Sequence, residues 1–168
     1  RSPSRGLGDV YKRQKEPWVD TVLILLYSGW RISELLNLKP EDINLQAGTM
    51  KGGTKTKAGK DRVVPIHSKI RALVEARLAE GGPRLISYNG RACSQTQYRV
   101  FWADIMKALE MNHTPHECRH TFETQLDSAG ANRKCIDLLM GHVSKDTGNR
   151  VYNHKTLDEL KATVELIQ

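Results

Sequence analysis

The stretch that runs from residue 18 to residue 38, WVDTVLILLYSGWRISELLNL, decides the fold class. Its first apolar residues recur at the i, i+3, i+4 and i+7 spacing of an α-helix: Trp18, Val22, Leu25, Leu26 and Gly29. A second short helix is expected through residues 32–36, and Pro40 marks its exit. The sequence therefore predicts two consecutive helices with a junction at residues 29–31.

A small antiparallel sheet is expected directly after these helices. Residues 43–50 have the pattern of a strand, Gly52 and Gly53 break it, and residues 62–66 form a returning strand. The turn between them is unusually basic, with Lys55, Lys57 and Lys60. This segment is predicted to be a β-hairpin with a basic turn.

The rest of the chain is predicted to be helical. Helices are expected over residues 68–79, 94–111, 114–130, 132–140, 144–152 and 157–167. Thr114 is the expected cap of the third of these, with Pro115 at its first position. The fold class is therefore mainly α with a small antiparallel β-sheet (α+β), in one domain over residues 15–168.

Residues 1–14 (RSPSRGLGDVYKRQ) show no helical or strand period. We expect a non-native or disordered leader here, or a truncated linker, and a disordered basic arm is the alternative.

Composition places the chain among soluble globular proteins, with 39% hydrophobic and 27% charged residues. No apolar run approaches the ~18 residues of a membrane span. The three cysteines are odd in number and lack C-x-x-C spacing, which favours reduced thiols in a cytoplasmic protein. A net charge of +7 favours a polyanionic partner, although only mildly once the basic leader is set aside.

One candidate site is the pentapeptide HECRH at residues 116–120, at the start of a predicted helix. His116, Arg119 and His120 are expected on one face, where the helix N-terminus favours an anion. The same residues fit the H-E-x-x-H pattern of zinc peptidases, for which His142 is a possible third ligand. Arg119 between the two histidines would repel a dication, which disfavours the zinc interpretation.

Three further fragments carry possible chemistry. Arg31 and Glu34 lie one turn apart at the helix junction, the hairpin turn is rich in lysine, and Gly141-His142 is followed ten residues later by Tyr152. Each has a bland interpretation: a helical ion pair, a solvated turn, and a packed tyrosine. A phenol has a pKa of ~10, so Tyr152 becomes a nucleophile only beside a base or strong positive charge.

Taken in order, the four fragments resemble the catalytic domain of tyrosine recombinases, the phage integrase family. The resemblance runs from about Glu16 to Gln168, and it is strongest to integrases of phages and conjugative elements of Gram-positive bacteria. It implies site-specific DNA recombination or integration for a mobile genetic element, with strand cleavage and rejoining through a 3′-phosphotyrosine. It also implies that no metal or nucleotide cofactor takes part.

The resemblance assigns roles to individual residues. Arg31 and Arg119 match the two arginines that clamp the scissile phosphate, and Tyr152 matches the nucleophile. His116 matches the residue that takes or shuttles the tyrosine proton, and His142 the one that hydrogen-bonds the phosphate.

The remaining assignments concern the leaving group and the support of the site. Lys55 is the favoured general acid for the leaving 5′-oxygen, with Lys57 as the alternative and Lys60 less suited. Glu34 is expected to support the arginines, and His120 to hold its helix against the core.

The family resemblance also implies partners. Double-stranded DNA is the expected substrate, and a homo-oligomer, a tetramer on DNA, is expected to form through the C-terminal segment. Leu157, Leu160, Val164 and Ile167 form an apolar stripe there, which packs either on its own domain or on a neighbouring subunit.

Family members usually carry an N-terminal core-binding domain, which we expect to be absent here, so that DNA binding is weak and strongly salt-dependent. Three rival functions stay open at this point: type IB topoisomerase-like nicking and closing, a catalytically inert DNA-binding module, and the zinc metallopeptidase.

Overall fold

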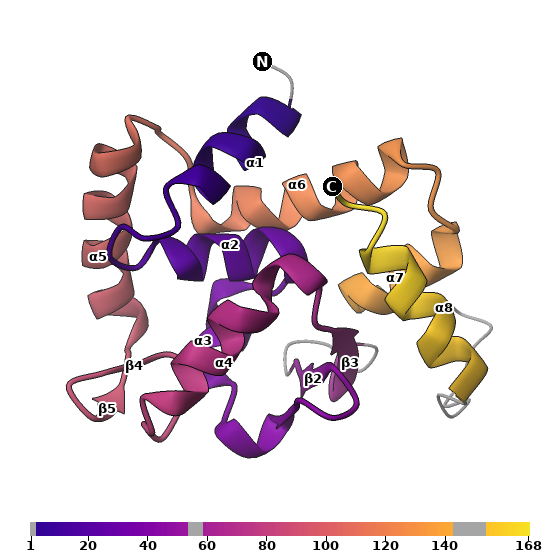
Figure 1. The fold of residues 1–168 in the computed structure, drawn as a ribbon, viewed down its shortest axis with the longest axis horizontal. Coiled ribbons are helices and arrows are strands. Elements are labelled where there is room, and N and C mark those ends of the chain that lie inside the picture. The colour runs from indigo at the N-terminus through magenta and orange to yellow at the C-terminus, as the bar shows by residue number, and fades with distance from the viewer. Residues whose placement is uncertain (1–2, 54–58, 143–153) are drawn as a thin grey trace.

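The computed structural model of the chain describes residues 3–53, 59–142 and 154–168. Helices dominate it, with two small antiparallel sheets (Figure 1). The helices are α1 (Pro3–Lys12), α2 (Val19–Ser28), α3 (Ile32–Asn37), η1 (Pro40–Asp42), η2 (Ser68–Ile70), α4 (Arg71–Ala79), α5 (Gln95–Leu109), α6 (Pro115–Ser128), α7 (Arg133–Met140) and α8 (His154–Val164). The strands are β1 (Ile43–Asn44), β2 (Thr49–Gly52), β3 (Arg62–Pro65), β4 (Ser87–Tyr88) and β5 (Arg91–Ala92). The predicted α+β class is confirmed.

Helix α2 is the centre of the molecule, with α6 packed along one side and α4 on the other (Figure 1). Every residue of α2 except Asp20 is buried, as expected for a helix that is apolar on nearly all sides. The helix begins at Val19, because Trp18 has a positive φ of 66°.

Gly29 lets α2 and α6 approach closely. It ends α2 with a φ of 71°, and a Cβ at this position would lie 2.4 Å from Cδ1 of Phe122 on α6. Only glycine adopts this conformation in this space without strain. The junction predicted at residues 29–31 is therefore confirmed, and it fixes Arg31 at the start of α3.

The strand expected over residues 43–50 is wrong, because two strands occupy this region. The chain turns after β1, where Oδ1 of Asn44 accepts a hydrogen bond from the Ala47 amide at 2.9 Å, and β2 then pairs with both β1 and β3. Asparagine favours such a turn because its side chain replaces a backbone acceptor. The short β4–β5 hairpin was not predicted.

The expectation that residues 1–14 lack regular structure is also wrong. Helix α1 packs on α2, and its Leu7 and Val10 side chains are buried. These two residues are three apart and share a helix face, while Gly6 and Gly8 weaken the helical signal. Tertiary contact therefore overrides a poor local propensity.

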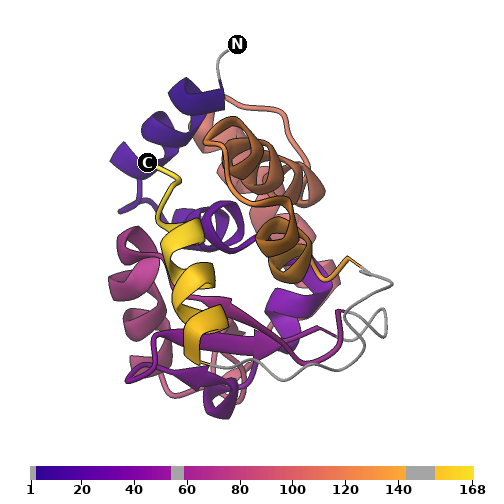
Figure 2. The same ribbon diagram turned by 90° about the vertical axis from the view of Figure 1, so that its right-hand side faces the viewer.

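The C-terminal apolar stripe packs on its own domain. Helix α8 covers β3 and contacts α7, and it faces the viewer in Figure 2. Leu160, Val164 and Ile167 are each at most 2% exposed. Nε2 of His67 donates a hydrogen bond to the Ile167 carbonyl at 2.7 Å, which fixes the end of the chain.

Two further findings concern the chain as a whole. The three cysteines are free and buried. Among the described segments, no helix is long and apolar enough to cross a membrane.

Candidate active site

Three arginines from three different elements surround one carboxylate. Arg31 comes from the start of α3, Arg62 from β3 and Arg119 from α6, and the carboxylate is that of Glu34. We call these four residues the arginine cluster. With three positive charges and one negative charge, it carries a formal charge of +2 in the interior of the protein.

Glu34 links two of the arginines. Its side chain is 1% exposed, Oε1 accepts a hydrogen bond from Nη1 of Arg31 at 2.7 Å, and Oε2 accepts one from Nη2 of Arg62 at 2.5 Å. Burial alone would raise the pKa of this carboxyl, but the hydrogen bonds and charges of Arg62 and Arg31 outweigh it, and the pKa lies below its ordinary value. Glu34 is therefore ionised at neutral pH, and it forms ion pairs with both Arg31 and Arg62.

Arg119 faces into the protein and joins the C-terminal ends of α2 and α7. Its Nη1 donates to the Gly29 carbonyl at 2.7 Å, and its Nη2 donates to the Met140 carbonyl at 2.5 Å. Burial, followed by repulsion from Arg31 and Arg62, lowers the pKa of this guanidinium to about 10. An anion beside Arg119 would relieve this repulsion, so the cluster is suited to bind a phosphate.

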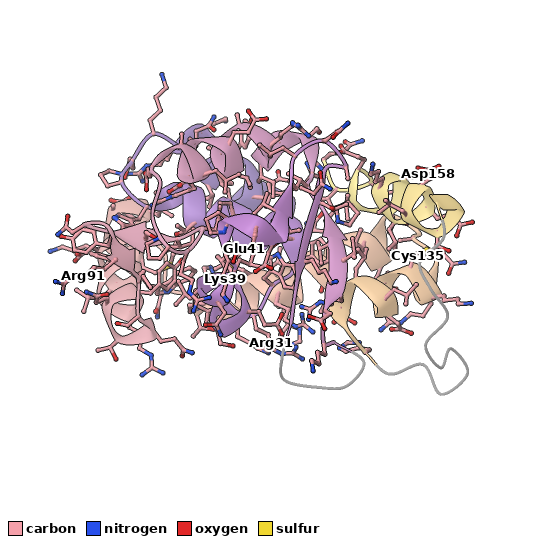
Figure 3. The ribbon with its side chains drawn as sticks, turned by 90° about the horizontal axis from the view of Figure 1, so that it is seen from below. Arg31, Lys39, Glu41, Arg91, Cys135 and Asp158 are labelled. Carbon is pink, nitrogen blue, oxygen red and sulfur yellow. The ribbon has the colours of Figure 1, made fainter. Side chains whose placement is uncertain are left out.

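Arg31 is the member of the cluster that reaches the surface. Its side chain is 21% exposed, and Figure 3 shows it at the edge of the molecule. Within the described part of the chain its side chain donates a hydrogen bond to Glu34, and a guanidinium has five N–H groups. Arg31 can therefore hold Glu34 and an external anion at the same time.

Arg62 was not among the residues singled out from the sequence. It is 1% exposed, and it donates from Nε to the Leu139 carbonyl at 3.0 Å and from Nη1 to the Gly59 carbonyl at 3.2 Å. One signal could have revealed it: side chains alternate along a strand, so Arg62 shares the face of the buried Val64. A charged residue on a buried face indicates a buried partner.

The polar residues at the start of α6 do not all point the same way. Thr114 and Glu117 form the predicted cap, and His116 and His120 are exposed with ring centroids 5.6 Å apart. Arg119 points inward instead, because consecutive residues on a helix are about 100° apart. The expected single face is therefore wrong for Arg119, and so is the expectation that His120 packs against the core.

His142 lies where α7 ends. Gly141 closes the helix with a φ of 70°, and the His142 side chain is 42% exposed, with Nδ1 3.7 Å from Oδ1 of Asp137. A Cβ on Gly141 would lie 2.7 Å from Cα of Gly59. The base of the hairpin turn and the end of α7 are therefore in contact beside the arginine cluster.

The other predicted site residues, Lys55, Lys57 and Tyr152, lie outside the described residues. The described chain on either side of the lysine-bearing turn ends at Gly53 and Gly59, and that before Tyr152 ends at His142. Gly59 accepts a hydrogen bond from Arg62, and Gly141, the residue before His142, lies against Gly59 and Arg62. The described ends of both segments thus lie next to the cluster.

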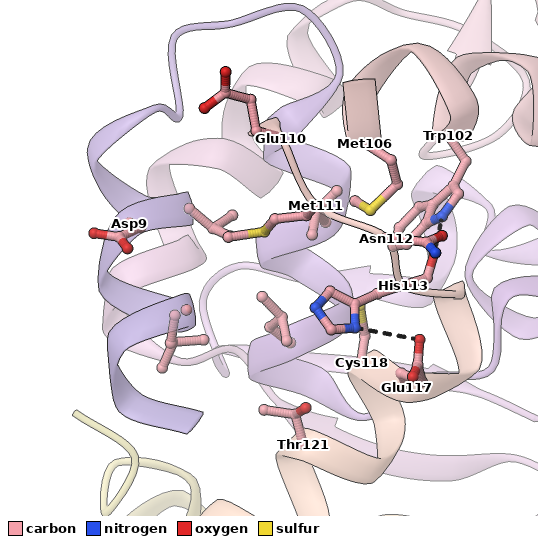
Figure 4. Close-up of a pocket in the computed structure, with 15 residues that line it drawn as sticks. Asp9, Trp102, Met106, Glu110, Met111, Asn112, His113, Glu117, Cys118 and Thr121 are labelled. Atoms are coloured by element: carbon pink, nitrogen blue, oxygen red, sulfur yellow. Dashed lines mark hydrogen bonds and ion pairs between the residues drawn. The ribbon is translucent and has the colours of Figure 1, made fainter. Parts of the chain in front are cut away.

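Two other features lie apart from this cluster. A cavity of about 730 Å³ between α1, α2, α5 and α6 is lined by apolar side chains such as Val10, Trp102 and Met106, and it includes no residue of the cluster (Figure 4). Within the described ranges, no three His, Cys, Asp or Glu side chains are grouped so that they could hold a metal ion. The HECRH histidines thus gain no third ligand from the described residues.

Comparisons with known proteins agree with this geometry. The model of the phage integrase family matches residues 11–159. The chain is 34% identical over 153 residues to the tyrosine recombinase XerA of Thermococcus kodakarensis, which covers 86% of this chain and 53% of that protein. It is 36% identical over 148 residues to the tyrosine recombinase XerC of Pelobacter propionicus, which covers 83% of this chain and 48% of that protein.

Solved structures show the same fold. A crystal structure of XerA recombinase superposes with a TM-score of 0.71 at 23% identity, over 94% of this chain and 62% of that one. The Tn1549 transposon integrase in complex with circular intermediate DNA gives a TM-score of 0.71 at 22% identity, over 95% of this chain and 59% of that one. The chain spans about half the length of the relatives that it matches in sequence. With its family model, its relatives and its fold in agreement, the chain belongs to the phage integrase family of tyrosine recombinases.

Proposed function

We propose that this chain is the catalytic part of a site-specific DNA recombinase or integrase that breaks and rejoins DNA strands through Tyr152. The observation that carries the proposal is the convergence of Arg31 and Arg119 on one buried cluster of net positive charge. This cluster adjoins Gly59 and Gly141, which lie at or next to the described ends of the segments that bear the hairpin lysines and Tyr152.

In the proposed reaction, the two arginines bind the non-bridging oxygens of the scissile phosphate. The phenolic oxygen of Tyr152 attacks phosphorus, a 3′-phosphotyrosine bond forms, and the bond from phosphorus to the 5′-oxygen breaks. His116 takes the phenolic proton, and Lys55, or Lys57 in its place, gives a proton to the leaving 5′-oxygen. His142 adds a hydrogen bond to the phosphate.

Preorganised positive charge accounts for much of the rate in such a step. The phosphate gains negative charge at its equatorial oxygens, and the guanidinium groups are already fixed by Glu34, Gly29 and Met140 before DNA arrives. Loss of one such donor typically slows a reaction by ~10²–10³-fold. The reverse attack by a 5′-hydroxyl restores the phosphodiester, so no external energy source is required.

The partners follow from the same proposal. Double-stranded DNA is the proposed substrate, in keeping with the Tn1549 integrase complexes with DNA. The proposed assembly is a tetramer on DNA that forms through the C-terminal segment. The proposed location is the cytoplasm, in association with the nucleoid when the protein is bound to DNA.

The test is covalent capture on a nicked DNA substrate. A pool of duplexes with randomised sequence around the nick is incubated with protein in EDTA, which removes divalent metal ions. Because of the nick, cleavage releases a short 5′-hydroxyl fragment, which diffuses away and leaves the adduct trapped. The proposal predicts a protein–DNA adduct on a denaturing gel that is lost in Tyr152→Phe and kept in the control Tyr88→Phe, whose side chain is exposed. Absence of an adduct with wild-type protein, or an adduct that survives Tyr152→Phe, would overturn it.

A further inference from the structure

Arg62 joins three segments that meet at the arginine cluster. Each of its guanidinium nitrogens has a separate acceptor: Nη2 binds Glu34 on α3, Nη1 binds the Gly59 carbonyl at the base of the hairpin turn, and Nε binds the Leu139 carbonyl near the end of α7. Its planar group also lies 4.5 Å above the ring of Trp30. A side chain with this many fixed partners has one position.

The base of the turn and the end of α7 also touch each other directly, in addition to the bridge that Arg62 forms between them. A Cβ on Gly141 would lie 2.7 Å from Cα of Gly59 and 3.1 Å from Nη1 of Arg62. The base of the turn therefore rests directly on the end of α7, and the Arg62 side chain spans the same contact. Because the Arg62 side chain bonds to both Gly59 and Leu139, a change in its position is expected to move the base of the turn relative to α7.

Lysine cannot take the place of Arg62. An ammonium group has three donors around one atom, whereas the guanidinium presents five donors in a rigid plane. The three acceptors of Arg62 lie on different elements, so a lysine that pairs with Glu34 would leave the Gly59 and Leu139 carbonyls without this donor. Arg62→Lys thus keeps the charge and removes the bridge.

We propose that Arg62 is a positioning residue, which holds the base of the hairpin turn against the end of α7 and so sets where the general acid of the turn meets the leaving 5′-oxygen. The inference rests on the proposed function, in which that acid protonates the 5′-oxygen as its bond to phosphorus breaks. Displacement of a reacting group by about 1 Å can cost ~10²-fold in rate. The loss is expected in the protonation of the leaving group rather than in the binding of the phosphate.

A change of leaving atom separates these two effects. In a duplex with sulfur in place of the bridging 5′-oxygen, the leaving group is a thiolate, which can depart without a proton because a thiol, with a pKa of ~8.5, is a far stronger acid than an alcohol. Single-turnover rates of adduct formation are measured for the oxygen and the sulfur duplex, together with the dissociation constant of each for DNA. Both duplexes share one sequence, which is chosen from those that form an adduct with wild-type protein in the nicked pool.

The expected result is a ~10²-fold slower rate for Arg62→Lys on the oxygen duplex, a rate within about threefold of wild type on the sulfur duplex, and unchanged DNA affinity. Arg71→Lys is the matched control, because Arg71 is exposed and also donates to a backbone carbonyl. It should match wild type on both duplexes.

Two outcomes would overturn the inference. One is equal slowing of Arg62→Lys on both duplexes, which would place its effect on phosphate binding or on overall folding, and the other is a wild-type rate on the oxygen duplex. Failure of wild-type protein to form an adduct with either duplex would instead refute the proposed function, so the two failures are distinct. A thermal unfolding curve of each variant shows that the protein is folded at the assay temperature.

Discussion

Glu34→Gln removes the one negative charge of the arginine cluster and leaves the shape of the side chain nearly unchanged. The carboxylate is 1% exposed and accepts hydrogen bonds from Arg31 and Arg62. Glutamine keeps one acceptor oxygen and turns its NH₂ group toward one of the two guanidinium groups. Loss of one partner from a buried ion pair typically costs ~3–5 kcal/mol, which is a large share of the ~5–15 kcal/mol that stabilises a domain.

The assay is denaturant unfolding at several pH values. Because the pKa of Glu34 is lowered in the folded protein, its stabilising effect is complete above the ordinary carboxyl pKa and is lost as pH falls through the lowered value. Wild type should therefore exceed Glu34→Gln by ~3–5 kcal/mol at pH 7, and the gap should close below about pH 4.

The control is Glu75→Gln, which breaks an exposed ion pair with Arg71 and should change stability by ~0–1 kcal/mol. A difference below ~1 kcal/mol between wild type and Glu34→Gln at pH 7, or a difference that widens on acidification, would refute the reasoning.

Three further predictions follow from the packing around the site. Gly29→Ala should lower the free energy of unfolding by ~2–5 kcal/mol in denaturant titrations, because its Cβ would strain a positive φ and clash with Phe122; a loss below ~1 kcal/mol would contradict this. Burial lowers the pKa of His67, more than its bond to Ile167 raises it, so the stabilising effect of neutral His67 should be lost as pH falls below about 6.5; thermal melts of His67→Gln should lack this step. Leu160→Ala should cost ~2–5 kcal/mol, since the side chain of Leu160 on α8 is fully buried; an unchanged melting temperature would show that α8 is not docked on its own domain.

Short-range patterns predicted much of the fold. The α2–α3 junction, the cap at Thr114 and the end of α7 at Gly141 were all expected from single residues with strong conformational preferences. The strand break after Asn44 was not expected, although its turn is held by a local hydrogen bond from the Ala47 amide. Helix α1 was not expected, because its burial depends on contacts with α2. Local propensity carries little information about such contacts.

The candidate site shows the same division. Arg31, Glu34 and Arg119 were expected from motifs, and the structure brings them together. Arg62 was missed because alternation along the strand places its side chain on the buried face but does not say that it bridges α3 and α7. The prediction that His120 packs against the core was wrong. Residues 119 and 120 lie on two sides of one helix, and only the packing of α6 decides which side is buried.

The most direct measurement of the central claim is a crystal structure of the protein on a nicked duplex, trapped with Tyr152→Phe. The account predicts that the non-bridging oxygens of one phosphate lie about 2.7–3.2 Å from guanidinium nitrogens of both Arg31 and Arg119. It also predicts that the ring of residue 152 lies opposite the leaving 5′-oxygen. Two arginines that contact different phosphates, or a ring at residue 152 out of reach of the phosphate that they share, would contradict it.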